Sequence, residues 1–187
     1  LGLDLPQTIF PGVAALNPDQ INTSANTQPV FTTPQPWDLG DTFTIRAGVP
    51  NLAAIKVHMK AVGSVGANST LSVWNTPNDA YNGVTPLTSA TLLIDFFNDA
   101  DYTFIFPTPL TVTAGQVLFF GASVYNMVMY ASNTKNYAGG GEYLLQLGTG
   151  IIGPASSQDV YFETYSTVAN TERLYTNRDV AYILNDI

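Results

Sequence analysis

Hydrophobic and polar side chains alternate in short runs between residues 41 and 165. In the clearest run, residues 53–62, apolar side chains take one face, and two lysines and the only histidine of the chain take the other. These are Ile55, Val57, Met59 and Ala61 against Lys56, His58 and Lys60. Alternation with a period of two predicts a β-strand with one buried face. Similar runs predict strands at 41–46, 69–75, 90–95, 101–106, 110–113, 117–125, 142–147 and 159–166.

Turns rich in glycine, proline, asparagine and aspartate separate these runs about every 8 to 15 residues. This spacing is typical of a β-sandwich or barrel rather than of βαβ units. The sequence therefore predicts an all-β fold, an antiparallel β-sandwich over residues 41–165.

The run at 117–125, "VLFFGASVY", differs from the others because it is apolar on both faces. A strand of this kind is covered on both sides. We expect the opposite sheet to cover one face. Three candidates remain for the other: a loop, the N-terminal segment, or another chain.

Residues 1–40 and 166–187 flank the alternating region. The first segment holds six of the twelve prolines, which exclude helix and central strand alike, yet it is richer in apolar side chains than a disordered linker. We therefore predict an extended Pro-rich arm at 1–40, and a C-terminal arm or last element at 166–187. The side chains expected to bind a partner are Leu3, Leu5, Ile9, Phe10, Val13, Phe31, Trp37, Tyr182, Ile183 and Leu184.

Composition narrows the possible functions. Only 11% of the residues are charged, against about 25% in typical domains. Six Lys and Arg residues and a net charge of −8 argue against nucleic-acid binding, which depends on cations that neutralise phosphates. The absence of cysteine excludes disulfides and a thiol nucleophile, and no apolar run is long enough for a membrane helix. We expect neither a nucleic-acid nor a membrane partner.

Four short motifs within 41–165 form a recognisable pattern. They are Pro107–Thr111, Ala114-Gly115 before an apolar strand, the glycine-rich residues 139–141, and Asp159–Tyr165 in "DVYFETY". Together they resemble a family of jelly-roll modules found on phage particle proteins and on secreted or cell-surface attachment proteins. The resemblance implies a jelly-roll-like sandwich with an attachment or carbohydrate-binding role and no catalysis.

The side chains that usually carry catalysis are scarce. His58 lies mid-strand between two lysines, and neither a G-x-S-x-G nor an H-E-x-x-H motif occurs. Lys56 and Lys60 are expected to pair with an aspartate on the next strand. Paired carboxylates can hydrolyse glycosides, but the available ones are better explained as turn and surface residues: Asp95, Asp99, Asp101, Asp159 and Glu163. Residues 98–101 lack the spacing of a calcium loop. We expect no cofactor, no metal and no catalytic residue.

Aromatic and amide side chains are the remaining groups that could bind a ligand such as a glycan. A possible glycan site comprises Trp74, Asn75, Tyr81 and Asn82, and a second group comprises Tyr125, Tyr130, Asn133 and Tyr137. Such residues are also ordinary at the turns of a sandwich, which is the simpler interpretation.

The sequence thus favours a non-enzymatic structural protein of a phage or virus particle, located in the virion. It would dock on neighbouring capsid or tail subunits through its arms, as a capsid decoration (cement) protein or a tail or fibre component, and form a homo-oligomer. The alternative is a carbohydrate-binding adhesion module of a secreted or cell-surface protein.

Overall fold

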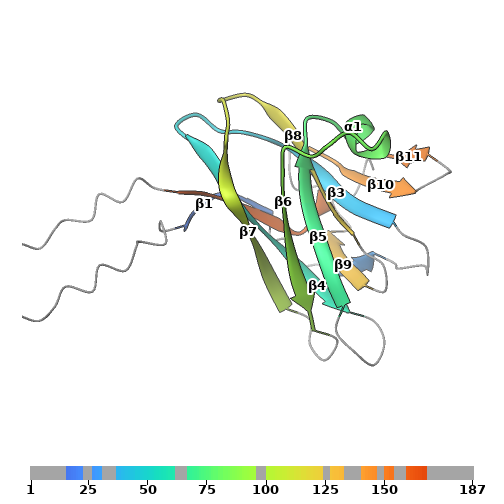
Figure 1. The fold of residues 1–187 in the computed structure, drawn as a ribbon. Coiled ribbons are helices and arrows are strands. Elements are labelled where there is room, and N and C mark those ends of the chain that lie inside the picture. The colour runs from blue at the N-terminus through green and yellow to red at the C-terminus, as the bar shows by residue number, and fades with distance from the viewer. Residues whose placement is uncertain are drawn as a thin grey trace, which may run out of the picture. The chain divides into compact units, whose positions relative to one another are not determined.

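The computed structural model describes residues 16–22, 27–30, 37–61, 67–95, 100–123, 127–132, 140–146, 150–153 and 159–167, all within the compact unit Leu16–Thr167. These residues form two antiparallel sheets and one short helix (Figure 1). The all-β fold expected from the sequence is confirmed. No helix among the described residues has the length and apolar character needed to cross a membrane.

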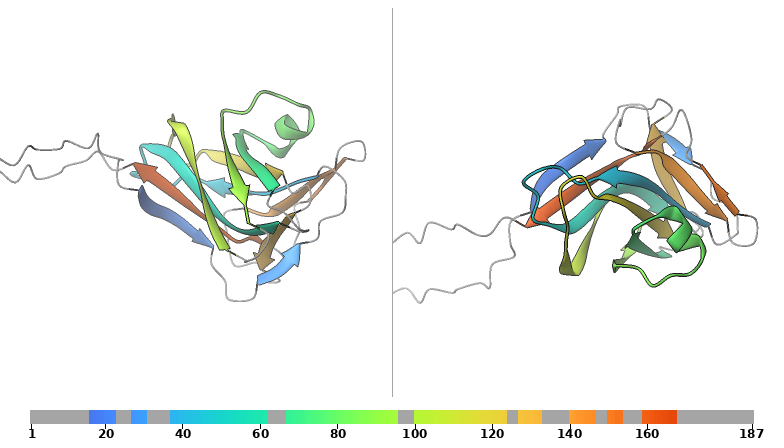
Figure 2. Two further views of the ribbon diagram at one scale, coloured as in Figure 1. Left: turned by 60° about the horizontal axis from the view of Figure 1, so that its bottom comes forward. Right: turned by 90° about the horizontal axis from the view of Figure 1, so that it is seen from above.

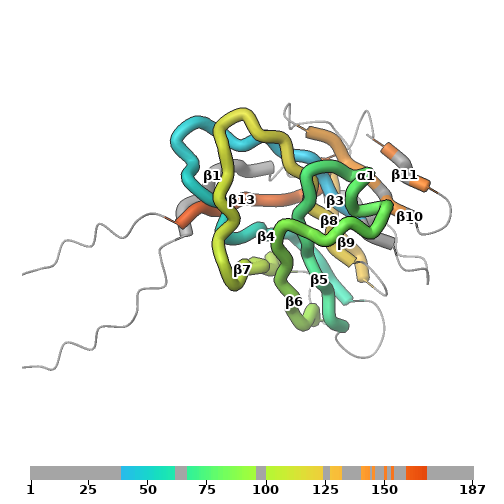
Figure 3. The backbone as a smooth tube through the Cα atoms, turned by 45° about the horizontal axis from the view of Figure 1, so that its top comes forward, coloured from blue at the N-terminus to red at the C-terminus, as the bar shows by residue number. Residues whose placement is uncertain are grey.

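The first sheet has seven strands. Five follow in the order β1 (Leu16–Asn22), β13 (Phe162–Thr167), β4 (Asn51–Ala61), β9 (Met127–Ser132) and β12 (Asp159–Val160). Two more lie off this path: β2 (Thr27–Val30) pairs with β9, and β7 (Ala100–Thr111) pairs with β4. Strand β13 pairs with β1 on one side and with β4 on the other, and the tube view shows β13 beside β4 (Figure 3).

The second sheet has six strands. Their order is β11 (Gly150–Ile152), β10 (Glu142–Gln146), β3 (Trp37–Thr44), β8 (Val117–Ser123), β5 (Ala67–Trp74) and β6 (Thr88–Ile94). The helix α1 (Pro77–Tyr81) lies between β5 and β6 in the chain (Figure 2).

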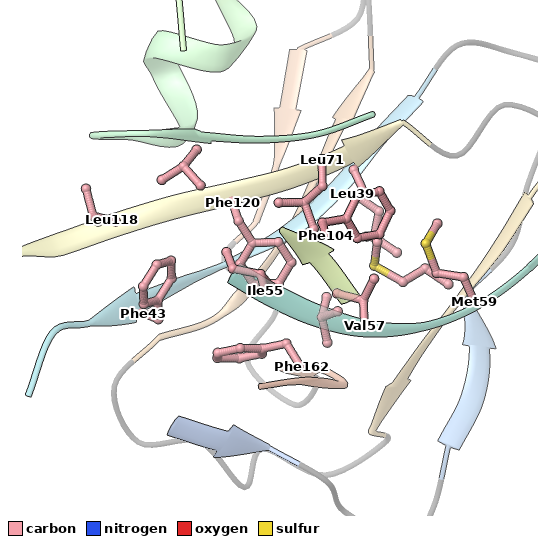
Figure 4. Packing of buried hydrophobic residues seen from close by; sticks show 14 of the residues in the cluster. Leu39, Phe43, Ile55, Val57, Met59, Leu71, Phe104, Leu118, Phe120 and Phe162 are labelled. Atoms are coloured by element: carbon pink, nitrogen blue, oxygen red, sulfur yellow. The ribbon is translucent and has the colours of Figure 1, made fainter. Parts of the chain in front are cut away.

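The inner faces of the two sheets share one hydrophobic core (Figure 4). At its centre Phe43 and Phe120 from the six-stranded sheet meet Phe162 from the seven-stranded sheet, with ring centroids 5.1 to 6.2 Å apart. Inclined pairs at this separation are the favourable arrangement for aromatic rings. Ile55 and Val57 on β4 are also fully buried, as the alternation of that strand predicts.

Strand β8 shows what covers a strand that is apolar on both faces. Its Leu118, Phe120 and Ala122 belong to the shared core. Phe119 points the other way and joins a second cluster with Trp74 and Leu145, against which Ala80 of α1 packs. The second cover is therefore the segment around α1, which is the loop among the three candidates.

The N-terminal segment differs from the predicted arm in one respect. Residues 16–22, 27–30 and 37–40, which fall in the segment expected to be an arm, are strands of the two sheets. Proline is compatible with this because Pro18 and Pro29 lie in β1 and β2, each paired on one side only. Residues 1–15 and 168–187 lie outside the described residues.

Two expected strands merge and one divides. The run at 101–106 and the first two residues of the run at 110–113 belong to one strand, β7, whose register on β4 jumps from Ala54↔Ile105 to Leu52↔Leu110. The extra residues include Pro107 and Pro109, which cannot donate to a ladder.

The run at 159–166 divides at Tyr161. Before it, β12 pairs with β9 through Val160↔Ala131, and after it β13 pairs with β4 from Phe162↔Val57. Strand β9 pairs with β4 only through residues 127–129, at the beginning of β9. Beyond these residues the two strands separate, and the chain passes from β12 to β13 at this point. We call this place the fork at Tyr161.

Gly40 has no room for a side chain. A Cβ atom at this position would lie 1.7 Å from the carbonyl oxygen of Phe120, whereas one at its partner Gly121 would lie 3.2 Å from the Phe119 ring. We predict that Gly40→Ala lowers the free energy of unfolding by more than about 3 kcal/mol. Gly121→Ala is the control, and we expect it to lower the free energy of unfolding by less. The side chain of Phe119 can shift to make room, whereas the backbone of Phe120 cannot. Equal losses in denaturant unfolding would contradict this account.

Candidate functional site

Polar and aromatic side chains gather on the outer face of the seven-stranded sheet, around β4. Register places Asp101 of β7 opposite His58, and Glu163 of β13 opposite Lys56. The fork brings Tyr161 to the same surface. We call this surface the His58 face and define it by six residues: Lys56, His58, Asp101, Tyr130, Tyr161 and Glu163.

The charged groups of the His58 face are paired with one another. The Lys56 ammonium lies 2.7 Å from Oε1 of Glu163 and 3.4 Å from Oδ2 of Asp101. Nδ1 of His58 lies 2.7 Å from Oδ1 of Asp101, and the Tyr165 hydroxyl donates to Oε2 of Glu163. The expected lysine–aspartate pair on the next strand is thus present. Burial lowers the pKa of Lys56, but its hydrogen bonds to Glu163 and Tyr165 outweigh this and hold the pKa above its ordinary value.

Two tyrosine rings flank His58. The Tyr130 ring lies edge-on at a centroid distance of 4.8 Å, and the Tyr161 ring lies at 5.6 Å. The main-chain N–H of Tyr161 donates to the carbonyl oxygen of Tyr130 at 2.9 Å, which ties the two residues together. Both tyrosine side chains are partly exposed, as are the side chains of His58 (23%) and Asp101 (39%).

This arrangement offers groups that can bind a ligand. His58 contacts Asp101, Tyr130 and Tyr161, and none of these is the serine, threonine or cysteine that a histidine base activates. The face instead offers ring surfaces, carboxylate acceptors and a lysine, all held by neighbours.

A second group of polar residues lies inside, beside the fork. Asp41 and Glu142 are register partners on β3 and β10, and Asp159 lies on β12 of the other sheet; all three are buried. The N–H of Val160 donates to Oδ2 of Asp41 at 3.0 Å, whereas Oε2 of Glu142 accepts no hydrogen bond from the described residues. Within the described part of the chain, no group of three His, Asp or Glu side chains is arranged to hold a metal ion.

Burial keeps the carboxyl groups of Asp41 and Glu142 protonated to higher pH than usual. It raises the pKa of Glu142 to about 7, with a further contribution from the charge of Asp159. It also raises the pKa of Asp41 well above the ordinary range, although the hydrogen bond from Val160 counteracts part of this. Like charges that are buried close together favour the neutral form.

A carboxyl group whose pKa is higher in the folded state binds more protons there than in the unfolded chain. Its contribution to stability is therefore complete below the unfolded pKa of about 4.5 and is lost as pH rises through the folded pKa of about 7. We predict that Glu142→Gln removes a pH-dependent loss on the order of 3 kcal/mol between pH 4.5 and 8. Denaturant unfolding across this range measures it.

The control for that experiment is Asn75→Ala, which changes an exposed side chain that has no titratable group. It leaves the slope of stability against pH close to that of the unaltered chain. An unchanged slope in Glu142→Gln would contradict the account of the buried carboxyl group.

The residues expected to bind a partner lie mostly outside the described residues. This holds for Leu3, Leu5, Ile9, Phe10, Val13, Phe31, Tyr182, Ile183 and Leu184. Trp37 begins β3, where its backbone pairs with Gln146. Of the considered carboxylates, Asp101 and Glu163 join the His58 face, Asp159 is buried and Asp95 is exposed; Asp99 is outside the described residues. Of the second aromatic group, Tyr130 is on the His58 face, and Tyr125, Asn133 and Tyr137 are outside.

The possible glycan site is not assembled as expected, because its tryptophan is buried. Trp74 is 9% exposed, packs against Phe119 and donates from Nε1 to the carbonyl oxygen of Val84 at 2.8 Å. Its ring is therefore not available for stacking on a sugar. Asn75 and Asn82 are exposed and Tyr81 is partly exposed, at the two ends of the α1 segment.

Trp74 consequently has a structural role. We predict that Trp74→Ala lowers the free energy of unfolding by about 3 to 5 kcal/mol, the usual cost of truncating a buried aromatic side chain. Tyr81→Ala, on a partly exposed side chain of the same segment, should cost less than about 1 kcal/mol. Thermal and denaturant unfolding of the two variants measures the difference. A Trp74→Ala variant as stable as Tyr81→Ala would show that the second cluster contributes little to the stability of the fold.

Sequence reasoning missed the clustering of Tyr130 and Tyr161 around His58. One signal was present: Glu163 and Tyr165 share a face of their strand by alternation, as Lys56 and His58 do. The register that brings the two strands together has no local signature.

No family model matches the chain, and no curated protein shows significant sequence similarity to it.

Proposed function

We propose that the chain is a non-enzymatic structural protein of a phage or virus particle, which docks on neighbouring subunits through its two extensions. The jelly-roll connectivity implied by the sequence resemblance is part of this proposal. Its location in the virion follows from the same resemblance.

The observation that carries the proposal is the pairing of Leu16 with Thr167 at the end of the ladder between β1 and β13. Leu16 and Thr167, the positions at which the two extensions join the sandwich, are therefore neighbours in the sheet. Both extensions are rich in apolar side chains. Two apolar segments that start at one corner can engage the same neighbour, and their combined affinity then exceeds that of either alone.

The sandwich and the two extensions have different roles in this proposal. Among the side chains that the structure describes, the core runs from Leu39 to Phe162, and the strands bury their apolar faces against each other. We propose that the extensions serve association rather than folding. The preferred partner is a further copy of the chain, as expected for a homo-oligomeric particle component.

We predict that the full chain forms a homo-oligomer and that removal of residues 1–15, of residues 168–187, or of both reduces it to a monomer. Light scattering coupled to size-exclusion chromatography measures the mass. The deletions stop short of β1 and β13, so the thermal unfolding midpoint of the sandwich should shift by no more than a few degrees.

The control is a surface variant that changes neither extension, Thr91→Ala on β6, which should keep the mass of the full chain. A full chain that remains monomeric at high concentration would contradict docking between copies. An oligomer that survives both deletions would contradict the role of the extensions.

A further inference from the structure

The His58 face combines two kinds of group, aromatic rings and carboxylates. Partly exposed rings of Tyr130 and Tyr161 flank an imidazole, and carboxylates of Asp101 and Glu163 lie on the neighbouring strands. His58, Asp101, Tyr130 and Glu163 lie on paired strands. Tyr161 lies between β12 and β13, and its main-chain N–H is bonded to the carbonyl oxygen of Tyr130. A binding site needs this kind of preorganisation to avoid the entropy cost of ordering side chains.

We propose that the His58 face binds an uncharged saccharide. This inference goes beyond the docking role of the extensions and does not depend on it. The ligand class follows from three properties of the surface: its rings, its acceptors and its charge.

The rings match the apolar surface of a sugar. A pyranose presents C–H groups on its faces and hydroxyl groups around its rim, so it packs on an aromatic ring while its hydroxyls reach polar neighbours. Aromatic side chains with a few well-placed polar groups are the common lining of small-molecule sites. Tyr130, Tyr161 and His58 supply three rings within one contact cluster.

The carboxylates match the hydroxyl rim. Each carboxylate oxygen of Asp101 and Glu163 already contacts one protein group: Lys56 or His58 for Asp101, and Lys56 or Tyr165 for Glu163. A carboxylate oxygen has two lone-pair positions, so each retains acceptor capacity. These contacts fix the acceptors in place, and a hydroxyl group is the neutral donor that complements them.

The charge of the face disfavours other ligands. The face holds two carboxylates and one lysine in a chain of net charge −8, which disfavours phosphate, sulfate and sialic acid as ligands. A protein partner would be expected to meet an apolar centre, since the fully buried part of an interface is depleted in charge. Here the centre of the face is occupied by ion pairs.

The test uses the full chain on an array of neutral oligosaccharides built from glucose, galactose, mannose and N-acetylglucosamine, with sialylated and sulfated glycans alongside. Titration calorimetry then measures the affinity of the neutral glycan that gives the strongest signal. We expect saturable binding to a neutral glycan, and at least a tenfold loss of affinity in both Tyr161→Ala and Asp101→Asn. Asp101 is the most exposed member of the charged cluster, so its variant separates loss of binding from loss of folding.

The matched control is Tyr81→Ala, which removes a partly exposed tyrosine from the other sheet's covering segment and should keep the affinity within twofold. Three outcomes overturn the proposal: no binding to any neutral glycan, binding to anionic glycans alone, or a loss in Tyr81→Ala with Asp101→Asn unaffected. The last would place a glycan site at the α1 segment instead. None of these outcomes changes the oligomer mass, so the docking proposal stands or falls separately.

Discussion

The burial of one face of β4 determines where the other features of the seven-stranded sheet lie. Ile55, Val57 and Met59 are fully enclosed between the sheets, and a slip of one residue would expose all of them. The register of β4 is therefore strongly specified. Its neighbours inherit this constraint, because their own buried residues must reach the same core. The outward positions, Lys56 and His58, are placed as a consequence.

The fork at Tyr161 connects the core to the surface. Val160 is buried and its N–H is bonded to Asp41 of the opposite sheet, whereas the next residue, Tyr161, already belongs to the His58 face. The buried carboxyl group of Asp41 thus contacts the residue before Tyr161, and Asp159 lies two residues before Tyr161. Their burial is tolerable while some of them carry protons, since neutral carboxyl groups lose far less solvation than carboxylates. The protonation of these buried carboxyl groups therefore affects the stability of the fork at Tyr161.

The sequence predicted those elements whose signal is local. The alternation predicted β4 correctly, because one face of this strand is buried and the other faces outward. It did not find β1 and β2, since their prolines argue against a central strand and say nothing against an edge. The helix α1 carries a capping box, with Thr76 and Asp79 bonded reciprocally and Pro77 in its first turn, which was visible in the sequence. Its five residues were too few for a periodic pattern to support it.

The contacts that form the His58 face join residues far apart in the sequence, and local patterns do not predict them. Glu163 meets Lys56 across more than a hundred residues of chain, through a ladder that no local rule specifies. Trp74 illustrates the same limit: its position beside a polar loop suggests exposure, but Phe119 and Val84 enclose it.

Strand β13 relates the two proposed roles of the molecule. One of its ends, Thr167, pairs with Leu16, where the extensions begin; the other follows Tyr161 at the fork. Six residues of strand separate these points, roughly 20 Å at the usual rise per residue. A neighbour held at the first point need not cover the second. Attachment at one end of the strand and ligand binding at the other are therefore physically compatible in a single chain, because each uses side chains that the other leaves free.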